Sequence, residues 1–274
     1  MPQEETLTLL QSTPLFRGVN EEELEKFVTY CKFEQLSVGE TIIFNARFRD
    51  EIPIVLVTKG CVALHTTTVY GTYKRIVLAL VMPTQLVYEF QFLGDPLPES
   101  SSIVPIDETD VVSFYPNRFE ALIKTQPVIM RNLAQTMMFK QNISNFHLEA
   151  VSQTKGGAKI ATMLSGFFRL NAWRPPDYDD LRLKQEMQLS IMWSIDLITR
   201  YLSCDVRTAR GGLVELIKAG LIKVQWFDDE LMPIENVSAQ DVRDLGRKGG
   251  RLHEETYFRI SILKPNRLEE YCGG

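Results

Sequence analysis

The residues best suited to chemistry lie in one stretch, residues 204 to 219, which reads CDVRTARGGLVELIKA. Arg207 and Arg210 carry guanidinium groups that can donate paired hydrogen bonds to guanine or to phosphate, and the Thr208 hydroxyl lies between them. All three fall in the first turn and a half of a predicted helix. Because a helix in the DNA major groove presents its N-terminal residues to base edges, the stretch predicts contact with DNA.

Two adjacent glycines, Gly211 and Gly212, interrupt the same helix. Each glycine inside a helix costs roughly 1 kcal/mol relative to alanine, so the pair needs a reason. Missing side chains would let the helix lie close to DNA, or would let a neighbouring helix cross close to it. The sequence leaves both reasons open.

The elements around this stretch predict a winged helix-turn-helix. Ser194 suits the N-cap of a short first helix, and Asp205 the N-cap of a second helix that ends at Gly220. A three-residue turn joins the two helices, and a strand follows them. We expect Ser194, Lys218 and the wing to orient the second helix on DNA. An αα-hairpin that only packs a core shares the pattern.

The tail contains a long insert. About thirty residues, 226 to 255, precede TYFRISIL, which we expect to be the returning strand of the wing. Arg247, Lys248 and Arg251 stand among glycines in this insert and could reach a phosphate backbone or the minor groove. A flexible, solvated loop fits the same residues equally well.

A long helix is predicted upstream, over residues 127 to 154, where no proline interrupts the chain. At about 1.5 Å per residue it would be about 42 Å long, more than a small domain needs. Its apolar positions alternate at spacings of four and three, which favours a seam with a second copy of the chain; packing on its own β-domain is the alternative. The predicted dimer-helix residues are Ile129, Leu133, Met137, Ile143, Phe146 and His147.

The first part of the chain, to about residue 115, consists of short extended segments separated by turn signals at roughly ten-residue spacing. This pattern is typical of a β-sandwich or small barrel. A short acidic helix precedes the segments, with Asn20 as its expected N-cap, and a second short helix is expected from Pro116. Lys155-Gly156-Gly157 is the expected hinge after the long helix.

Charge is distributed unevenly along the chain. The net charge is −5, but residues 155 to 225 hold 11 Lys and Arg against 7 Asp and Glu, and both flanking segments are acidic. A basic middle segment agrees with DNA binding, although a solvated face has the same composition. No apolar run is long enough to span a membrane, and the acidic N-terminus lacks the pattern of a signal peptide. We therefore expect a cytoplasmic protein without a membrane partner.

Metal, cofactor and catalytic motifs are missing from the sequence. The four cysteines contain no CxxC pair and the three histidines are scattered, so we expect no metal site, no iron–sulfur cluster and no haem. No nucleophile elbow, Walker loop, HExxH or dinucleotide fingerprint appears. An enzyme is the least favoured class of function.

The order of motifs from about Pro14 to Val224 resembles the bacterial transcription regulators of the cyclic-AMP receptor protein and FNR (CRP/FNR) superfamily. PLFRGV, VGETII, IVLVTKGCVAL and VYEF precede the long helix and the helix pair in the order found in that family. The resemblance implies an α+β fold. Its parts would be an N-terminal cyclic-nucleotide-binding-like β-roll (jelly roll) over residues 1–126, a dimerisation helix over 127–154, and a C-terminal winged helix-turn-helix over 155–274.

The expected effector pocket departs from the family pattern. Members that bind a cyclic nucleotide use a glutamate for the ribose, which Glu89 matches, and an Arg-Ser or Arg-Thr pair for the phosphate. Here the pair falls at Glu99-Ser100, and a carboxylate repels a phosphate. Glu89, Ser100 and Ser101 are the residues that the resemblance places in the pocket, and we expect the effector not to be a cyclic nucleotide.

The sequence thus predicts a homodimeric regulator that reads palindromic double-stranded DNA. RNA polymerase and an unidentified small-molecule effector are further partners that the resemblance allows. The alternative is a ligand-sensing or scaffolding protein on the same fold that no longer reads DNA. The shifted arginines and the glycine pair motivate this alternative.

Overall fold

The computed structural model describes residues 3–43, 52–67, 75–89, 101–172, 187–188, 191–245 and 252–272. It divides into two compact units, Met1–Lys140 and Gln141–Gly274. The division falls inside the long helix α5 (Val128–Ser152) and not at residues 126 and 155, where the sequence analysis placed it. The reason is that the first part of α5 buries side chains in the first unit, whereas its last part buries side chains in the second.

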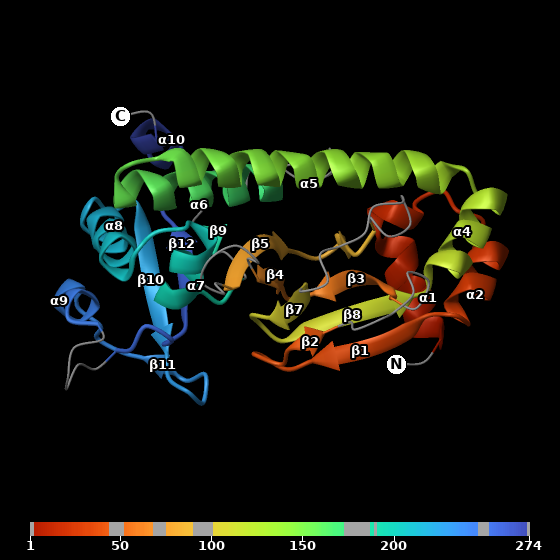
Figure 1. Cartoon of the computed structure of the whole chain (residues 1–274), viewed down its shortest axis with the longest axis horizontal. Coiled ribbons are helices and arrows are strands. Elements are labelled where there is room, and N and C mark those ends of the chain that lie inside the picture. Colours follow the sequence, from red (N-terminus) through yellow and green to blue (C-terminus); the bar gives the residue numbers. More distant parts are fainter. Residues whose placement is uncertain are drawn as a thin grey trace. The chain divides into compact units, whose positions relative to one another are not determined.

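The first unit contains two four-stranded antiparallel sheets within its described residues (Figure 1). One sheet has the strand order β1-β8-β3-β6 and the other has the order β2-β7-β4-β5. The prediction of a β-sandwich is confirmed. The strands are β1 (Lys32–Leu36), β2 (Ile42–Ile43), β3 (Ile54–Lys59), β4 (Val62–Thr67), β5 (Arg75–Val81), β6 (Leu86–Val87), β7 (Ser102–Pro105) and β8 (Thr109–Phe114).

Within the sheet β1-β8-β3-β6, the strands β3 and β8 are largely buried on both faces, whereas β1 is mostly exposed or half-buried. Alternate side chains of a strand point to opposite sides. Val55 and Val111 belong to the core between the two sheets. Leu56, Val112 and Phe114 belong to a second core, which the helices of this unit cover. Strands buried on both sides read as continuous apolar runs, as IVLV in β3 does.

The helices of the first unit close this second core. Asn20 caps α2 by accepting hydrogen bonds from two backbone N–H groups, and Pro116 begins α4, both as predicted. Aromatic rings from η1, α2, β8 and α4 meet at centroid distances of 5.1 to 6.4 Å. Figure 1 shows α1, α2 and α4 together at one end of the unit. The bounds are α1 (Gln3–Ser12), η1 (Pro14–Phe16), α2 (Glu21–Val28) and α4 (Pro116–Thr125).

The second unit combines helices with a sheet of strand order β11-β10-β12-β9 in its described residues. β12 pairs antiparallel with β10 from Ile222↔Ile262 to Trp226↔Phe258, which confirms the expected returning strand. The elements are α6 (Gly156–Ala172), β9 (Met187–Gln188), α7 (Ile195–Tyr201), α8 (Val206–Lys218), β10 (Ile222–Phe227), β11 (Pro233–Ile234), α9 (Ala239–Arg243), β12 (Phe258–Ile262) and α10 (Pro265–Cys272).

No helix among the described residues combines the length and the apolar character needed to cross a membrane. The same part of the chain contains no group of three or more His, Cys, Asp or Glu side chains that could hold a metal ion.

Candidate nucleic-acid interface

Side-chain caps define where the helices α7 and α8 begin. The Ser194 hydroxyl accepts a hydrogen bond from the Leu197 backbone N–H at 3.0 Å, and the Asp205 carboxylate accepts one from the Thr208 N–H at 2.6 Å. Gly220 follows α8 with a positive φ of 63°, and its N–H bonds back to the Ile217 carbonyl. The predicted caps and the predicted end of the second helix are therefore confirmed.

Asp205 also places charge at the start of α8. Hydrogen bonds from the Thr208 backbone and hydroxyl hold the pKa of Asp205 below its ordinary value, and the Arg207 guanidinium acts in the same direction. An ionised carboxylate stabilises the N-terminus of a helix. Asp205 therefore fixes the first turn, where Arg207 begins.

The outward face of α8 is narrow. Arg207, Gly211, Glu215 and Lys218 are exposed and recur at spacings of four, four and three residues, so they lie along one side of the helix. The opposite side is buried against the rest of the unit. The buried residues are Ala209, Gly212, Leu213, Val214 and Leu216.

Three residues that were predicted to contact or orient DNA make contacts within the chain. Ser194 is buried, and its hydroxyl is engaged as a cap. Arg210 Nη1 donates to the Leu245 carbonyl at 2.9 Å, which ties α8 to the segment after α9. The Thr208 backbone and side chain face the start of α6, where a Cβ on Gly156 would lie 2.3 Å from the Thr208 carbonyl oxygen. Sequence spacing did not reveal these contacts, because they depend on how α8 is rotated against α6.

The two central glycines of α8 serve different purposes. A Cβ on Gly212 would lie 2.3 Å from the carbonyl carbon of Gly156, so α6 and α8 cross in backbone contact at this point. A Cβ on Gly211 would meet nothing within 4 Å. Gly212 is thus explained by helix packing, whereas the packing of this unit does not explain Gly211.

The C-terminal helix α10 reaches α6 and α8, which the sequence analysis did not anticipate. The Tyr271 hydroxyl donates to Glu215 Oε1, and Arg169 Nε lies 2.7 Å from Glu269 Oε1. Burial and the neighbouring Glu215 carboxylate raise the pKa of Tyr271 to about 12. The aromatic residue therefore stays neutral and holds the acidic side chain of the α8 face in place.

The insert between β10 and β12 is partly folded. Ser238 and Asp241 form a capping box at the start of α9, and α9 packs against α8. The hairpin tip at Asp228, Asp229 and Glu230 is exposed and acidic. Arg247, Lys248 and Arg251 lie outside the described residues. Part of the insert thus differs from the flexible loop that the sequence analysis considered.

The predicted dimer-helix residues pack within their own chain, which corrects that assignment. Ile129 and Leu133 are buried in the core of the first unit, and Met137 packs against it. Ile143 is buried, and Phe146 and His147 face α6 and α7 of the second unit. The alternating apolar spacing identified the inward face of α5, because a core and a dimer seam demand the same periodicity.

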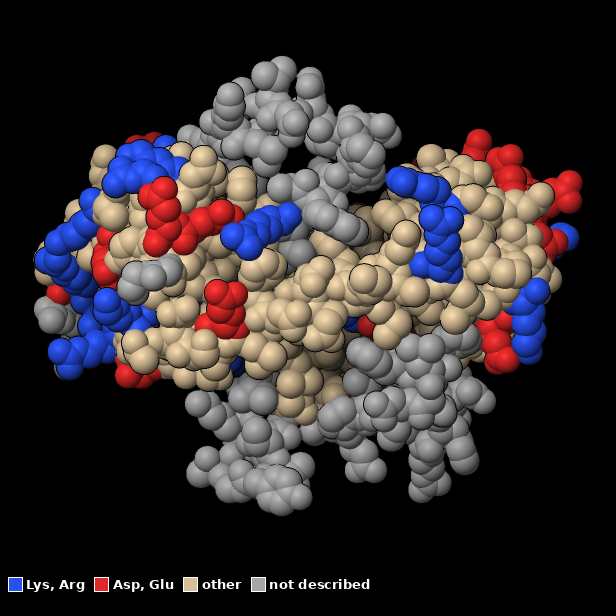
Figure 2. Space-filling model, turned by 90° about the horizontal axis from the view of Figure 1, so that it is seen from above, with Lys and Arg blue, Asp and Glu red and all other residues tan. Residues whose placement is uncertain are grey.

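The outward face of α5 carries a different set of residues. Met130, Met138 and Leu148 are exposed, at 41%, 69% and 66%, although all three are apolar. Arg131 and Glu149 are the charged residues among the exposed positions of this helix. Figure 2, which looks onto α5, shows a largely uncharged band along it.

His147 joins α5 to α7 within the second unit. Its ring stacks on Tyr201 with centroids 4.1 Å apart and an interplanar angle of 8°. His147 Nε2 lies 2.6 Å from the Tyr201 carbonyl oxygen, so that nitrogen carries the proton and donates it. Burial lowers the pKa of His147, partly offset by this hydrogen bond.

Comparisons with known proteins agree with this architecture. No protein-family model matches the chain. The Cyclic AMP receptor protein of Thermus thermophilus is 25% identical over 160 residues, which cover 58% of this chain and 72% of that protein. This similarity supports the resemblance to the CRP/FNR superfamily that the sequence predicted.

Solved structures share the fold of this chain. FixK2 from Bradyrhizobium japonicum has a TM-score of 0.57 at 14% identity, covering 88% of this chain and 96% of its own. A CRP-family transcriptional regulator from Thermus thermophilus has a TM-score of 0.53 at 18% identity, covering 88% and 97%. A cyclic nucleotide-binding domain containing protein from Listeria monocytogenes has a TM-score of 0.55 at 14% identity, covering 81% and 93%. At these identities the likeness concerns the fold alone.

Glu89, which the family resemblance assigns to an effector pocket, is paired within the chain. Glu89 is 2% exposed, and its Oε1 forms an ion pair with Lys140 Nζ of α5. The same ammonium group donates to the Leu86 carbonyl at 2.9 Å. Ser101 is buried, whereas Glu99 and Ser100 lie outside the described residues. The sequence analysis identified Glu89 but did not identify Lys140 as its partner.

Alanine at the two glycines should change stability in opposite directions. Gly212→Ala forces a Cβ into the Gly156 backbone, and we expect a loss of about 1–3 kcal/mol in the free energy of unfolding. Gly211→Ala has open space, and we expect a gain of about 0.5–1 kcal/mol from helix propensity. Urea unfolding of the purified variants measures both. Equal effects at the two positions would contradict the packing described for α6 and α8.

Stability should depend on pH through His147. The folded pKa is lower than the ordinary value of 6.5, so the unfolded chain binds a proton that the folded chain does not. The free energy of unfolding should therefore fall as the pH drops below about 6.5, by at most about 1.4 kcal/mol per pH unit from this residue. The variant His147→Phe, which keeps an aromatic ring, tests this contribution by urea unfolding. Between about pH 7.5 and 5 the free energy of unfolding of the variant should change less with pH than that of the wild type. Parallel slopes would rule out the contribution of His147.

Proposed function

We propose that the protein is a dimeric, sequence-specific transcription regulator of the CRP/FNR type. In this proposal α7 and α8 form the helix-turn-helix, and β10, β11 and β12 form the wing. The observation that carries the proposal is the outward edge of α8. There Arg207 is exposed one turn from Gly211, whose missing side chain leaves open space.

This edge has the geometry that a reading helix needs. Arg207 lies in the first turn of α8, and a guanidinium group there can donate two hydrogen bonds to a guanine or to a phosphate. Gly211 adds no side chain beside it, so the helix backbone can approach a base pair closely. Lys218 places a second exposed cation at the other end of the helix. In Figure 2, Lys and Arg side chains gather at the end of the second unit, with acidic groups among them.

The acidic groups near this edge limit how the domain meets DNA. Glu215 shares the exposed face, and Tyr271 holds its carboxylate. The tip between β10 and β11 carries three exposed carboxylates, which a phosphate backbone repels. We therefore propose that phosphate contacts in the wing come from Arg247, Lys248 and Arg251 and not from this tip.

The relatives support a regulatory role. The sequence relative is a receptor protein for cyclic AMP by name, and one of the structural neighbours is a transcriptional regulator of the CRP family. No comparison favours the alternative of a scaffolding protein that has lost its DNA site. That alternative becomes one outcome of the DNA-binding experiment.

We further propose that two copies associate through the outward face of α5. Arg131, Ala134, Met138, Gln141, Asn145, Leu148 and Ser152 follow one another at alternating spacings of three and four residues. This spacing is that of a coiled-coil seam, and Met138 and Leu148 are its most exposed apolar members. Covering them would remove apolar surface from water.

Control by a cyclic nucleotide is not part of the proposal. Glu89 already has a cationic partner in Lys140, and that ion pair would have to open before Glu89 could bind a ribose. Breaking a buried ion pair is costly. The sequence supports the same proposal through Glu99, which stands where the family's phosphate-binding arginine is expected.

The DNA-binding proposal is tested with a random duplex library and the purified full-length chain. We expect enrichment of an inverted repeat with half-sites about one helical turn, ~10 bp, apart. Arg207→Ala should weaken binding to the selected site by about 1–3 kcal/mol, measured by fluorescence anisotropy at fixed salt. Lys124→Ala, an exposed charge change in the other unit, is the control. A selected site that binds Arg207→Ala as tightly as the wild type would contradict the reading role of α8.

The dimer proposal is tested by sedimentation equilibrium. Met138→Glu combined with Leu148→Glu should convert a dimer to a monomer, because four carboxylates would then be buried at the seam. The substituted residues are exposed, so circular dichroism should show an unchanged fold. Gln135→Glu, exposed but off the seam, should remain a dimer. A dimer that survives the double substitution must associate through another surface.

The effector proposal predicts that cyclic AMP and cyclic GMP leave DNA affinity unchanged. The measurement is the anisotropy titration on the selected site, with and without each nucleotide at millimolar concentration. We expect the curves to coincide, because Glu89 is paired with Lys140 and the sequence GDPLPESSS around Glu99 contains no Lys or Arg. A shift of tenfold or more in affinity would overturn this proposal while leaving DNA binding intact.

A further inference from the structure

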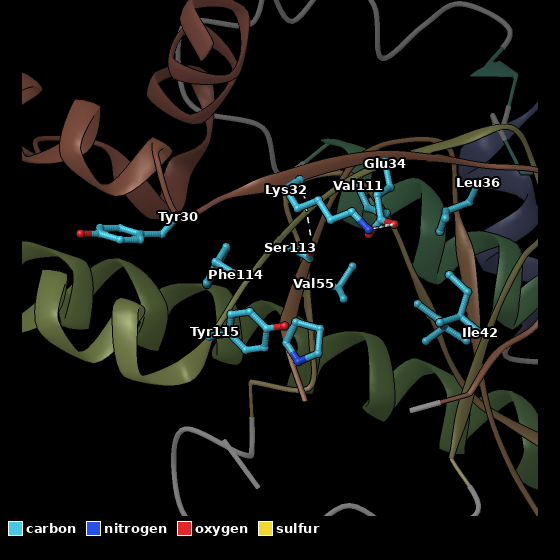
Figure 3. A pocket seen from close by; sticks show the side chains of 12 residues that line it. Tyr30, Lys32, Glu34, Leu36, Ile42, Val55, Val111, Ser113, Phe114 and Tyr115 are labelled. Carbon is cyan, nitrogen blue, oxygen red and sulfur yellow. Dashed lines mark hydrogen bonds and ion pairs between the residues drawn. The ribbon is translucent and has the colours of Figure 1, made fainter. Parts of the chain in front are cut away.

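A groove of about 360 Å³ opens between the two sheets of the first unit (Figure 3). β1, β3 and β8 supply one wall, and Ile42 of β2 and Ile103 of β7 supply the other. The groove does not involve Glu89, Ser101 or Lys140, which the sequence and the fold associate with the effector position. It is therefore a separate site in the same unit.

The floor of the groove is apolar. Leu36, Val55, Ile103 and Val111 line it and are all buried members of the core between the sheets. Ile42 is half-buried at its side. Their positions follow from strand alternation, since Leu36, Val55 and Val111 all point to the same face of one sheet. An apolar group that enters the groove would extend the existing core.

The rim of the groove carries one charge of each sign. Lys32 and Glu34 stand two residues apart on β1, so both side chains point to the face that bears Leu36. Lys32 Nζ lies 2.7 Å from Glu34 Oε1, and the side chains are 73% and 39% exposed. Figure 3 shows the pair at the rim, with Ser113 and Tyr115 beside it. Exposed ion pairs contribute little to stability, so a ligand can replace this one at small cost.

The volume limits the size of a ligand. If each non-hydrogen atom with its hydrogens fills about the 30 Å³ of a water molecule, the groove holds roughly twelve such atoms. A groove at the lower end of the size range of ligand sites suits a small amphipathic molecule.

We propose that this groove binds an apolar α-amino acid. Lys32 receives the α-carboxylate, Glu34 receives the α-ammonium group, and the side chain lies on the floor formed by Leu36, Val55 and Val111. A zwitterion pairs with both charges of the rim at once. A simple acid would pair with Lys32 but bring its carboxylate close to Glu34, and a simple amine would pair with Glu34 but bring its ammonium group close to Lys32. Phenylalanine has twelve non-hydrogen atoms, and at roughly the same volume per atom it would fill the groove. The proposal does not depend on DNA binding.

The first test is isothermal titration calorimetry of the full-length chain with L-phenylalanine. We expect saturable binding of one molecule per chain. 3-Phenylpropionate, which lacks the ammonium group, and 2-phenylethylamine, which lacks the carboxylate, should each bind at least about tenfold more weakly. Glycine, which lacks the apolar side chain, should show no binding. Absence of binding by phenylalanine, or binding of either analogue as tightly as phenylalanine, would overturn the proposal.

The second test assigns each charge to its residue. Lys32→Gln should weaken the binding of phenylalanine roughly tenfold, because its α-carboxylate has lost its partner. The same variant should bind 2-phenylethylamine, which has no carboxylate, as tightly as the wild type does. Glu34→Gln should weaken the binding of phenylalanine and leave the binding of 3-phenylpropionate as tight as in the wild type. Both residues are exposed, so the variants should fold, and Lys124→Gln is the matched control. Phenylalanine binding that both rim variants retain in full would place the amino acid at another site and overturn the proposal.

Discussion

The backbone contact between α6 and α8 decides how the candidate DNA-binding edge is presented. A Cβ at Gly156 or at Gly212 would lie 2.3 Å from backbone atoms of the other helix, so only glycine permits this crossing. The crossing sets the rotation of α8 about its own axis. Because residues advance by about 100° along a helix, burying Gly212 and Leu213 leaves Arg207 and Gly211 outward. The same rotation turns Thr208 toward α6 and Arg210 toward Leu245.

The long helix α5 shows a second consequence of helical periodicity. One of its faces is buried within the chain, through Ile129 and Leu133 in the first unit and Ile143 in the second. Its outward face is therefore the one that remains for another molecule. That face combines Met138 and Leu148 with uncharged polar residues such as Gln141 and Asn145. In the proposed dimer this face would form a seam of apolar and uncharged polar residues.

Charges inside the first unit are paired in two different ways. The Lys140–Glu89 pair is mostly buried, with side-chain exposures of 18% and 2%, and a ligand cannot displace it cheaply. The Lys32–Glu34 pair is exposed on a groove that leads to the core between the sheets. Exposure makes the second pair the easier one to exchange for a ligand. The two pairs therefore differ in how accessible their charges are to a ligand.

Local features were within reach of the sequence alone. The caps at Asn20, Ser194 and Asp205, the helix start at Pro116 and the helix end at Gly220 depend on residues within a few positions of one another, and all were predicted. The order of motifs also predicted the resemblance to the CRP/FNR superfamily, which the sequence relative supports. What the sequence could not supply was the partner of each side chain. An apolar repeat on α5 looks the same whether it faces a core or a second chain, and a glycine pair looks the same whether it meets a helix or a solvent-exposed edge. Only the tertiary structure separated Gly212 from Gly211 and placed Lys140 on Glu89, because these contacts join residues far apart in the chain whose approach depends on packing.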